Sequence, residues 1–171
     1  WPGAQRRAGV HVLRTVDDAV ALRAELRPGA RLVVIGAGFI GAEVASTATK
    51  LGLDVTVVEA ALAPLAGPLG VQLGAAVARL HAEHGTRLLC GAPVAGLTGT
   101  DRVTGVQLAD GRRLAADVVL VGIGAIPNIE WLRDSPLELA NGVVCDEGGA
   151  TSIPNVVAVG DCAAWHEPRV G

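Results

Sequence analysis

A chain of 171 residues with 50% hydrophobic and 18% charged residues is too apolar and too weakly charged to be intrinsically disordered. Its net charge of −3 and its 2% aromatic content argue against a nucleic-acid partner, which usually requires a basic surface and stacking rings. The uncharged stretches are shorter than the roughly 20 residues that cross a bilayer, so no membrane partner is expected.

The first half of the chain predicts a strand–helix–strand unit. Apolar residues at helical spacing lie between two short β-branched runs, and a right-handed parallel connection is expected for such a unit. In chain order the predicted elements are a linker or tail (1–8), a helix that follows a capping box at Thr15–Asp18 and ends at Pro28–Gly29, a buried strand (31–35), a helix (40–51) and a buried strand (55–58).

The second half adds a helix and short strands. These are a helix (69–80) stopped by Gly85, a strand (87–89), an antiparallel meander (94–114), a buried strand (118–121), and, after turns that begin at Pro127, a last buried strand (156–159). The fold class predicted is α/β, a Rossmann-like parallel sheet with an antiparallel β-meander.

The strongest motif is the GxGxxG fingerprint at Gly36, Gly38 and Gly41, which follows a buried strand and opens a helix. The first glycine permits the tight turn, the second allows the backbone to approach a pyrophosphate, and the third allows close packing of helix and strand. The pyrophosphate would meet unpaired N–H groups at the helix N-terminus. The alternative is a glycine turn without a ligand.

Glu59 ends the next strand, where an acidic side chain accepts hydrogen bonds from adenosine ribose hydroxyls. Its charge would repel a 2′-phosphate by roughly 4 kcal/mol at about 4 Å, before screening. Ala60 and Ala61 follow, so no adjacent arginine could bind that phosphate. NADH is therefore favoured over NADPH, with a surface glutamate at a strand end as the alternative.

Three weaker candidates keep two interpretations each. Glu43 either lies near the nicotinamide or the flavin, or is a first-turn acid stabilised by the helix dipole. Gly122 and Gly124 either bring the backbone close to a ligand at a strand end, or form an ordinary exit loop. Asp161 either caps a short helix that begins at Cys162, or binds a sugar-like hydroxyl.

Other chemistry is disfavoured. His81 and His84 lie one turn apart, but two ligands are too few for a metal site, and a helix C-terminus favours the protonated imidazole. Cys90, Cys145 and Cys162 form no CxxC pair and are typical of small buried residues in a reducing cytoplasm. We predict neither a metal site nor a catalytic side chain.

The order of these motifs resembles that of the NADH-dependent ferredoxin and rubredoxin reductases of oxygenase systems. These are FAD flavoproteins of the glutathione-reductase-like superfamily, similar to the pyridine nucleotide-disulfide oxidoreductases. The segments that carry the resemblance cover most of the chain and are 9–15, 17–19, 33–43, 122–128, 151–156 and 160–161.

The resemblance implies a set of cofactor contacts and a reaction. Hydride would pass from NADH to FAD, and single electrons would pass on to a ferredoxin- or rubredoxin-like iron–sulfur protein. Asp161 would hold the ribityl chain of FAD. The residues implied at the NADH site are Gly36, Gly38, Ile40, Gly41, Glu43, Glu59 and Gly124, to which Phe39 and Gly122 are added from the same two motifs.

The resemblance also implies that the chain is incomplete. It begins with Trp1, contains no Met and has a single GxGxxG fingerprint, whereas such reductases carry a second one for FAD. We expect a tail of the FAD domain (1–8), an NAD(H)-binding domain inserted in a two-domain flavoprotein (9–124) and a return segment of the FAD domain (125–171). Such a piece is expected to bind NADH, to hold FAD poorly and to turn over little. The alternative functions are an NADH oxidase, a nitrite-reductase-type flavoprotein and a non-catalytic dinucleotide-binding module.

Overall fold

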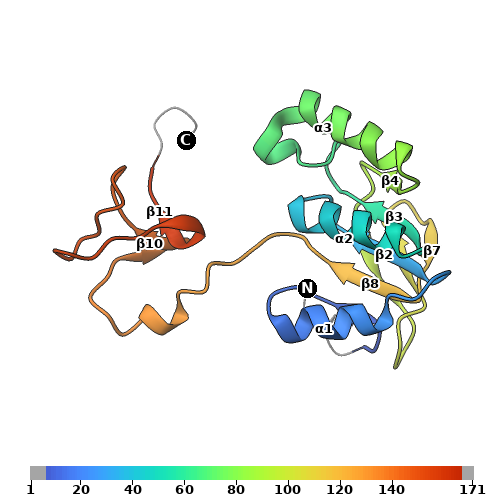
Figure 1. The fold of residues 1–171 in the computed structure, drawn as a ribbon, viewed down its shortest axis with the longest axis horizontal. Coiled ribbons are helices and arrows are strands. Elements are labelled where there is room, and N and C mark those ends of the chain that lie inside the picture. The colour runs from blue at the N-terminus through green and yellow to red at the C-terminus, as the bar shows by residue number, and fades with distance from the viewer. Residues whose placement is uncertain (1–6, 167–171) are drawn as a thin grey trace. The chain divides into compact units, whose positions relative to one another are not determined.

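The computed structural model describes residues 7–166, which fall into two compact units, one ending at Gly124 and the other starting at Ala125. In the first unit, five parallel strands form a sheet of order β1-β8-β2-β3-β4 (Figure 1). Residues 1–6 of the predicted tail lie outside the described residues. The elements of the first unit are β1 (Val10–His11), α1 (Val16–Glu25), β2 (Arg31–Ile35), α2 (Phe39–Lys50), β3 (Asp54–Val58), α3 (Ala66–Glu83), β4 (Arg87–Leu89), β5 (Val94–Thr98), β6 (Gly105–Leu108), β7 (Arg113–Ala115) and β8 (Val118–Val121).

The central strands are apolar throughout because both faces of the sheet are covered. Leu32 and Val34 of β2 belong to one core cluster, which includes Ala45 and Ala48 of α2. Side chains alternate along a strand, so Val33 and Ile35 point to the other face, where they join a second cluster with Val106 and Leu108 of β6. A run of four buried apolar residues in β2 follows from this sandwiching. The predicted α/β fold class is confirmed.

Helix α1 begins at the predicted capping box. The backbone N–H of Asp18 donates to Thr15 Oγ1, and the Asp18 carboxylate accepts the backbone N–H of Thr15. The helix ends at Glu25, however, earlier than the Pro28–Gly29 stop predicted from the sequence. A proline disfavours the helical region for the residue before it, which is Arg27, and the chain has already left the helix one residue earlier, where Leu26 is extended with φ −75° and ψ 91°.

The strand order creates a switch point. From β2 the chain builds outward through β3 and β4, then returns through the antiparallel sheet β5-β6-β7 to place β8 on the other side of β2. The carboxyl ends of β2 and β8 are therefore neighbours, with Ile35 opposite Val121 in the ladder. In open α/β sheets a crevice forms at this position, outside the carboxyl ends of the strands.

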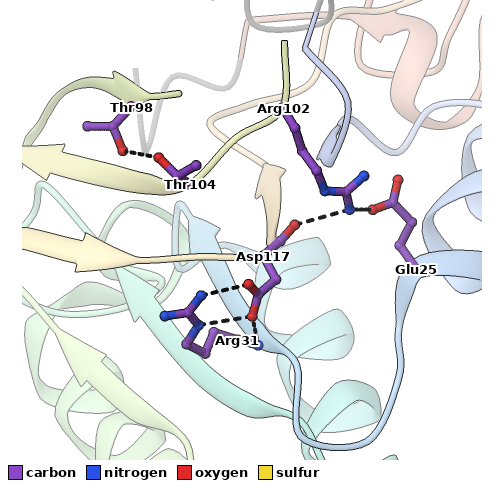
Figure 2. A network of polar contacts seen from close by, with 6 residues as sticks. All are labelled: Glu25, Arg31, Thr98, Arg102, Thr104 and Asp117. Atoms are coloured by element: carbon purple, nitrogen blue, oxygen red, sulfur yellow. Dashed lines mark hydrogen bonds and ion pairs between the residues drawn. The ribbon is translucent and has the colours of Figure 1, made fainter. Parts of the chain in front are cut away.

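The amino ends of the same two strands are joined by charged side chains (Figure 2). Asp117, just before β8, accepts hydrogen bonds from Arg31 Nε at 2.9 Å, Nη2 at 2.6 Å and the backbone N–H at 2.9 Å. Arg102, from the loop after β5, pairs with Glu25 at the end of α1 and lies 3.4 Å from the Asp117 carbonyl oxygen. This network links α1, the meander and the parallel sheet at the edge opposite the switch point.

We predict that Asp117→Asn lowers the free energy of unfolding at pH 7 by about 1 kcal/mol, a value kept small because both side chains are nearly half exposed. The hydrogen bonds from Arg31 lower the pKa of Asp117 from 3.8 to about 2. Because the pKa of Asp117 is lower in the folded state, its ionised carboxylate stabilises the fold fully above pH about 4. This stabilisation is lost as the pH falls toward about 2 and the carboxylate takes up a proton. Urea unfolding at pH 7, 4 and 3 checks the prediction. The difference between the wild type and the variant should shrink with falling pH, while the exposed control Asp101→Asn should show no such trend.

The second unit contains short elements and corrects two predictions. Its elements are η2 (Glu130–Leu132), β9 (Leu139–Ala140), β10 (Gly142–Val144), η3 (Gly160–Cys162) and β11 (Ala163–Ala164), with a sheet of order β11-β10-β9. The buried strand predicted at 156–159 is wrong. Val157 and Val159 are 66% and 76% exposed, because a single bridge from Val157 to Ala150 provides too little pairing to bury the run. The helix considered at Cys162 is also wrong, since the next two residues pair with β10 as a strand.

Of the helices between residues 7 and 166, none combines the length and the apolar character needed to cross a membrane.

Candidate functional site

A cleft of about 560 Å³ lies at the switch point, a volume within the range of roughly 300–1,000 Å³ seen for small-molecule sites. Its walls come from the carboxyl ends of four neighbouring strands and the segments that follow them. The lining residues belong to segments 35–39, 58–68, 92–94 and 122–124. We refer to residues 60–65, which connect β3 to α3 along one wall, as the strap.

Two of the fingerprint glycines are required by close packing. Gly36 has φ +101°, and a Cβ atom there would collide with the carbonyl oxygen of Gly122, which directly follows the neighbouring strand β8. Gly122 N–H in turn donates to the Ile35 carbonyl at 2.8 Å. A Cβ atom on Gly41, which is buried in α2, would collide with the Gly36 carbonyl oxygen. These contacts hold the loop and the start of α2 directly against the strand ends.

Gly38 differs from the other two glycines because a Cβ atom there would meet no atom within 4 Å. It is the N-cap of α2 and lines the cleft, and no side chain caps the helix. An uncapped N-terminus leaves N–H donors and the positive end of the helix dipole available to a ligand. The geometry suits an anion such as a diphosphate.

Glu59 lies beside this loop with its carboxylate fixed by two backbone donors. Ala37 N–H donates to Oε2 at 2.7 Å, and Ala61 N–H donates to Oε1 at 2.8 Å. A carboxylate oxygen can accept two hydrogen bonds, so each oxygen retains the capacity to accept one from a ligand hydroxyl. Two oxygens side by side match the two neighbouring hydroxyls of a ribose.

The charge of the cleft is negative. Among the residues that line it, Glu59 is the one charged side chain, and none carries a cationic group. Cys90 lies just beyond β4, where burial and then the Glu59 carboxylate raise the pKa of its thiol. This thiol therefore stays protonated at neutral pH and is a poor nucleophile.

Of the nine site residues predicted in the first unit, the structure brings six together around the cleft. Gly36, Gly38, Phe39, Glu59, Gly122 and Gly124 line it. Ile40, Gly41 and Glu43 of the same unit do not line it. Helix α2 starts at Phe39, which puts Glu43 in the second turn, so the interpretation as a first-turn acid is wrong. Asp161 belongs to the second unit, where it is exposed within η3.

Two lining segments were absent from the sequence predictions: the strap and residues 92–94 after β4. Each follows a predicted strand of the parallel sheet, and the carboxyl ends of parallel strands meet at one edge. These segments contain no motif that marks them as part of a site. The rule that the carboxyl ends of parallel strands meet was the signal that could have located them.

The two histidines of the pair lie at the end of α3, His81 in its last turn and His84 at its C-cap. Between residues 7 and 166 no group of three or more His, Cys, Asp and Glu side chains could hold a metal ion. Burial lowers the pKa of His81, which favours the neutral imidazole and contradicts the expectation that the helix C-terminus protonates it.

Comparison with known proteins shows the family. Residues 1–170 match the family model described as pyridine nucleotide-disulphide oxidoreductase. The chain belongs to the pyridine nucleotide-disulphide oxidoreductase family. The resemblance predicted from the motifs is thereby confirmed.

Relatives of this chain include proteins named as ferredoxin reductase components of dioxygenase systems. It is 47% identical over 164 residues to the ferredoxin reductase component of chlorobenzene dioxygenase from Cupriavidus sp. (strain PS12). That alignment covers 96% of this chain and 40% of the relative. It is 44% identical over 168 residues to rhodocoxin reductase from Rhodococcus erythropolis, in an alignment that covers 98% of this chain and 39% of the relative. The chain therefore spans about two fifths of the length of these relatives.

Among solved structures, this chain is similar to the covalent putidaredoxin reductase–putidaredoxin complex. The TM-score is 0.87 at 39% sequence identity, over 98% of this chain and 42% of the other.

Proposed function

We propose that this chain is the NADH-binding portion of an FAD-dependent reductase that passes electrons to a ferredoxin- or rubredoxin-type iron–sulfur protein. The observation that carries the nucleotide assignment is the cleft at the switch point. There an open glycine backbone at Gly38 and the uncapped N-terminus of α2 suit a diphosphate, and the fixed Glu59 carboxylate suits ribose hydroxyls.

NADH is favoured over NADPH by charge. A 2′-phosphate would lie against Glu59, and no cationic side chain lines the cleft to offset the repulsion. Two unit charges about 4 Å apart near a protein surface interact by roughly 4 kcal/mol before screening by salt. Even a fraction of that energy gives more than tenfold discrimination between the two nucleotides.

The FAD assignment rests on the second unit and on the family. Asp161 follows Gly160, which has a φ of +74° and starts the short helix η3. The Asp161 residue is exposed there, so its carboxylate is free to contact a ligand. An exposed acceptor of this kind fits a hydroxyl of a ribityl chain. When bound, FAD supplies the ability to accept a hydride and release single electrons. The contribution of this chain is to bind the nucleotide and orient it, and no side chain needs to act as a nucleophile.

The names of the relatives support an iron–sulfur acceptor, because they are reductases for ferredoxin-type components of oxygenase systems. No comparable observation on this chain favours oxygen, nitrite or a non-catalytic role. Three free, half-buried cysteines among the described residues are compatible with a reducing, cytoplasmic location, which remains a prediction.

Calorimetric titration of the protein with NADH and with NADPH tests the nucleotide assignment. We expect NADH to bind at least about tenfold more tightly, since the repulsion at Glu59 acts on NADPH alone. A parallel titration with FAD should show weak binding. Equal or tighter binding of NADPH would overturn the choice of nucleotide, and the absence of binding by both would overturn the site itself.

A further inference from the structure

One residue of the strap has a backbone conformation that its side chain disfavours. Between residues 7 and 166, the non-glycine residues with positive φ are Leu65, at 53°, and Asn155, at 65°. Asparagine tolerates the left-handed region because its short polar side chain can bond locally, whereas leucine rarely adopts it. Strained residues of this kind persist only where the surroundings hold them, and they cluster at ligand-binding sites. Leu65 lines the cleft.

The strained backbone of Leu65 makes a specific contact with the glycine loop. Its N–H donates to the Ala37 carbonyl at 3.1 Å, and its own carbonyl accepts the N–H of Leu69 at 2.9 Å, which starts α3. Ala37 is thus held at both of its backbone groups, since its N–H donates to Glu59 at 2.7 Å.

The strap is anchored on its far side, so Leu65 cannot relax by sliding. The Pro64 side chain is fully buried, and a Cβ atom on Gly74 of α3 would collide with the Pro64 carbonyl oxygen. Further back, the N–H of Gly91 donates to the Ala61 carbonyl at 2.8 Å. These contacts fix the position of the strap just before Leu65. The left-handed conformation of Leu65 then turns the chain into helix α3.

We propose that Leu65 is a positioning residue for the nucleotide. Its left-handed backbone directs its N–H to the Ala37 carbonyl and so fixes the peptide between Ala37 and Gly38. Because that peptide is planar and trans, fixing the carbonyl also fixes the direction of the Gly38 N–H. The carbonyl oxygen is kept bonded to the strap, where it cannot turn toward an anionic ligand. This role rests on the proposed NADH site.

Two substitutions separate this role from a purely structural one. Leu65→Gly removes a side chain that is 9% exposed but adopts the left-handed conformation freely. Leu65→Val keeps most of the apolar side chain, but a β-branched residue is strongly disfavoured at positive φ. We expect the Kd for NADH to rise about tenfold or more in Leu65→Val and by a clearly smaller factor in Leu65→Gly, which keeps the left-handed backbone. The urea midpoint should fall in Leu65→Gly because a buried side chain is lost.

The measurements are calorimetric titration with NADH and urea unfolding of each variant of the full chain. Leu62→Gly and Leu62→Val are matched controls in the same strap, because the Leu62 side chain is 83% exposed and does not line the cleft. Both should bind NADH as the wild type does. If Leu65→Val does not fold, Leu65→Ala replaces it, since alanine keeps more side chain than glycine but lacks its freedom at positive φ.

The outcomes distinguish this inference from the proposed function. If the wild type does not bind NADH, the proposed site is wrong. If the wild type binds NADH and Leu65→Gly loses more affinity than Leu65→Val or Leu65→Ala, the role of the left-handed backbone is wrong while the site stands. A Leu65→Val variant that bound NADH with the wild-type Kd would also show that the role assigned to the left-handed backbone is wrong.

Discussion

Gly36→Ala is expected to destabilise the first unit by about 3–5 kcal/mol, among the largest effects of any single substitution in this chain. Two costs combine at this position. The backbone has φ +101°, which is strained for any residue with a Cβ, and the added methyl group would collide with the Gly122 carbonyl oxygen. Because that oxygen belongs to the main chain at the end of β8, it can move only if the β2–β8 pairing is disturbed. Urea unfolding measures the loss.

Two other alanine substitutions serve as controls for Gly36→Ala. Gly29 has φ +80° but no atom within 4 Å of the added Cβ, so Gly29→Ala isolates the conformational cost, about 1 kcal/mol. Gly38→Ala has neither cost, because its φ is −78° and the methyl group enters open space in the cleft. We expect unchanged stability but at least about tenfold weaker NADH binding, since the methyl group takes the space of the diphosphate. Equal destabilisation by all three would contradict the packing argument.

Glu59→Gln is expected to weaken NADH binding by about 10- to 100-fold and to destabilise the fold by about 1–3 kcal/mol. The wild-type carboxylate accepts one backbone N–H on each oxygen, from Ala37 and from Ala61. An amide has one oxygen, so its NH₂ group must face the other N–H donor. The isosteric change therefore disturbs the glycine loop as well as the ribose contact. NADPH binding should fall less, because the repulsion of its 2′-phosphate is removed at the same time.

Calorimetry with both nucleotides gives the ratio that tests the role of Glu59. Glu59→Ala should also narrow the preference for NADH, whereas Glu83→Gln, an exposed acid at the end of α3, should leave both affinities unchanged. A Glu59→Gln variant that retained the full preference for NADH would show that the discrimination arises elsewhere in the cleft.

Local patterns predicted what depends on neighbouring residues in the chain. The capping box at Thr15 and Asp18, the run of apolar residues in β2 and the glycine spacing of the fingerprint each reflect a period or a cap that acts over a few residues. The strand 156–159 was predicted on the same kind of signal and is wrong, because burial of a strand depends on neighbours that a short apolar run does not reveal.

By itself the sequence determined the strand–helix–strand unit, the burial of its two strands and the acid that ends β3, because these follow from side-chain patterns and turn chemistry. Tertiary structure alone decided that β8 lies beside β2, so that Gly36 meets Gly122 and a cleft opens between them. It also brought the strap to that cleft with Leu65 in a left-handed conformation. Such arrangements depend on pairing between residues far apart in the chain, and no local pattern encodes which strands become neighbours.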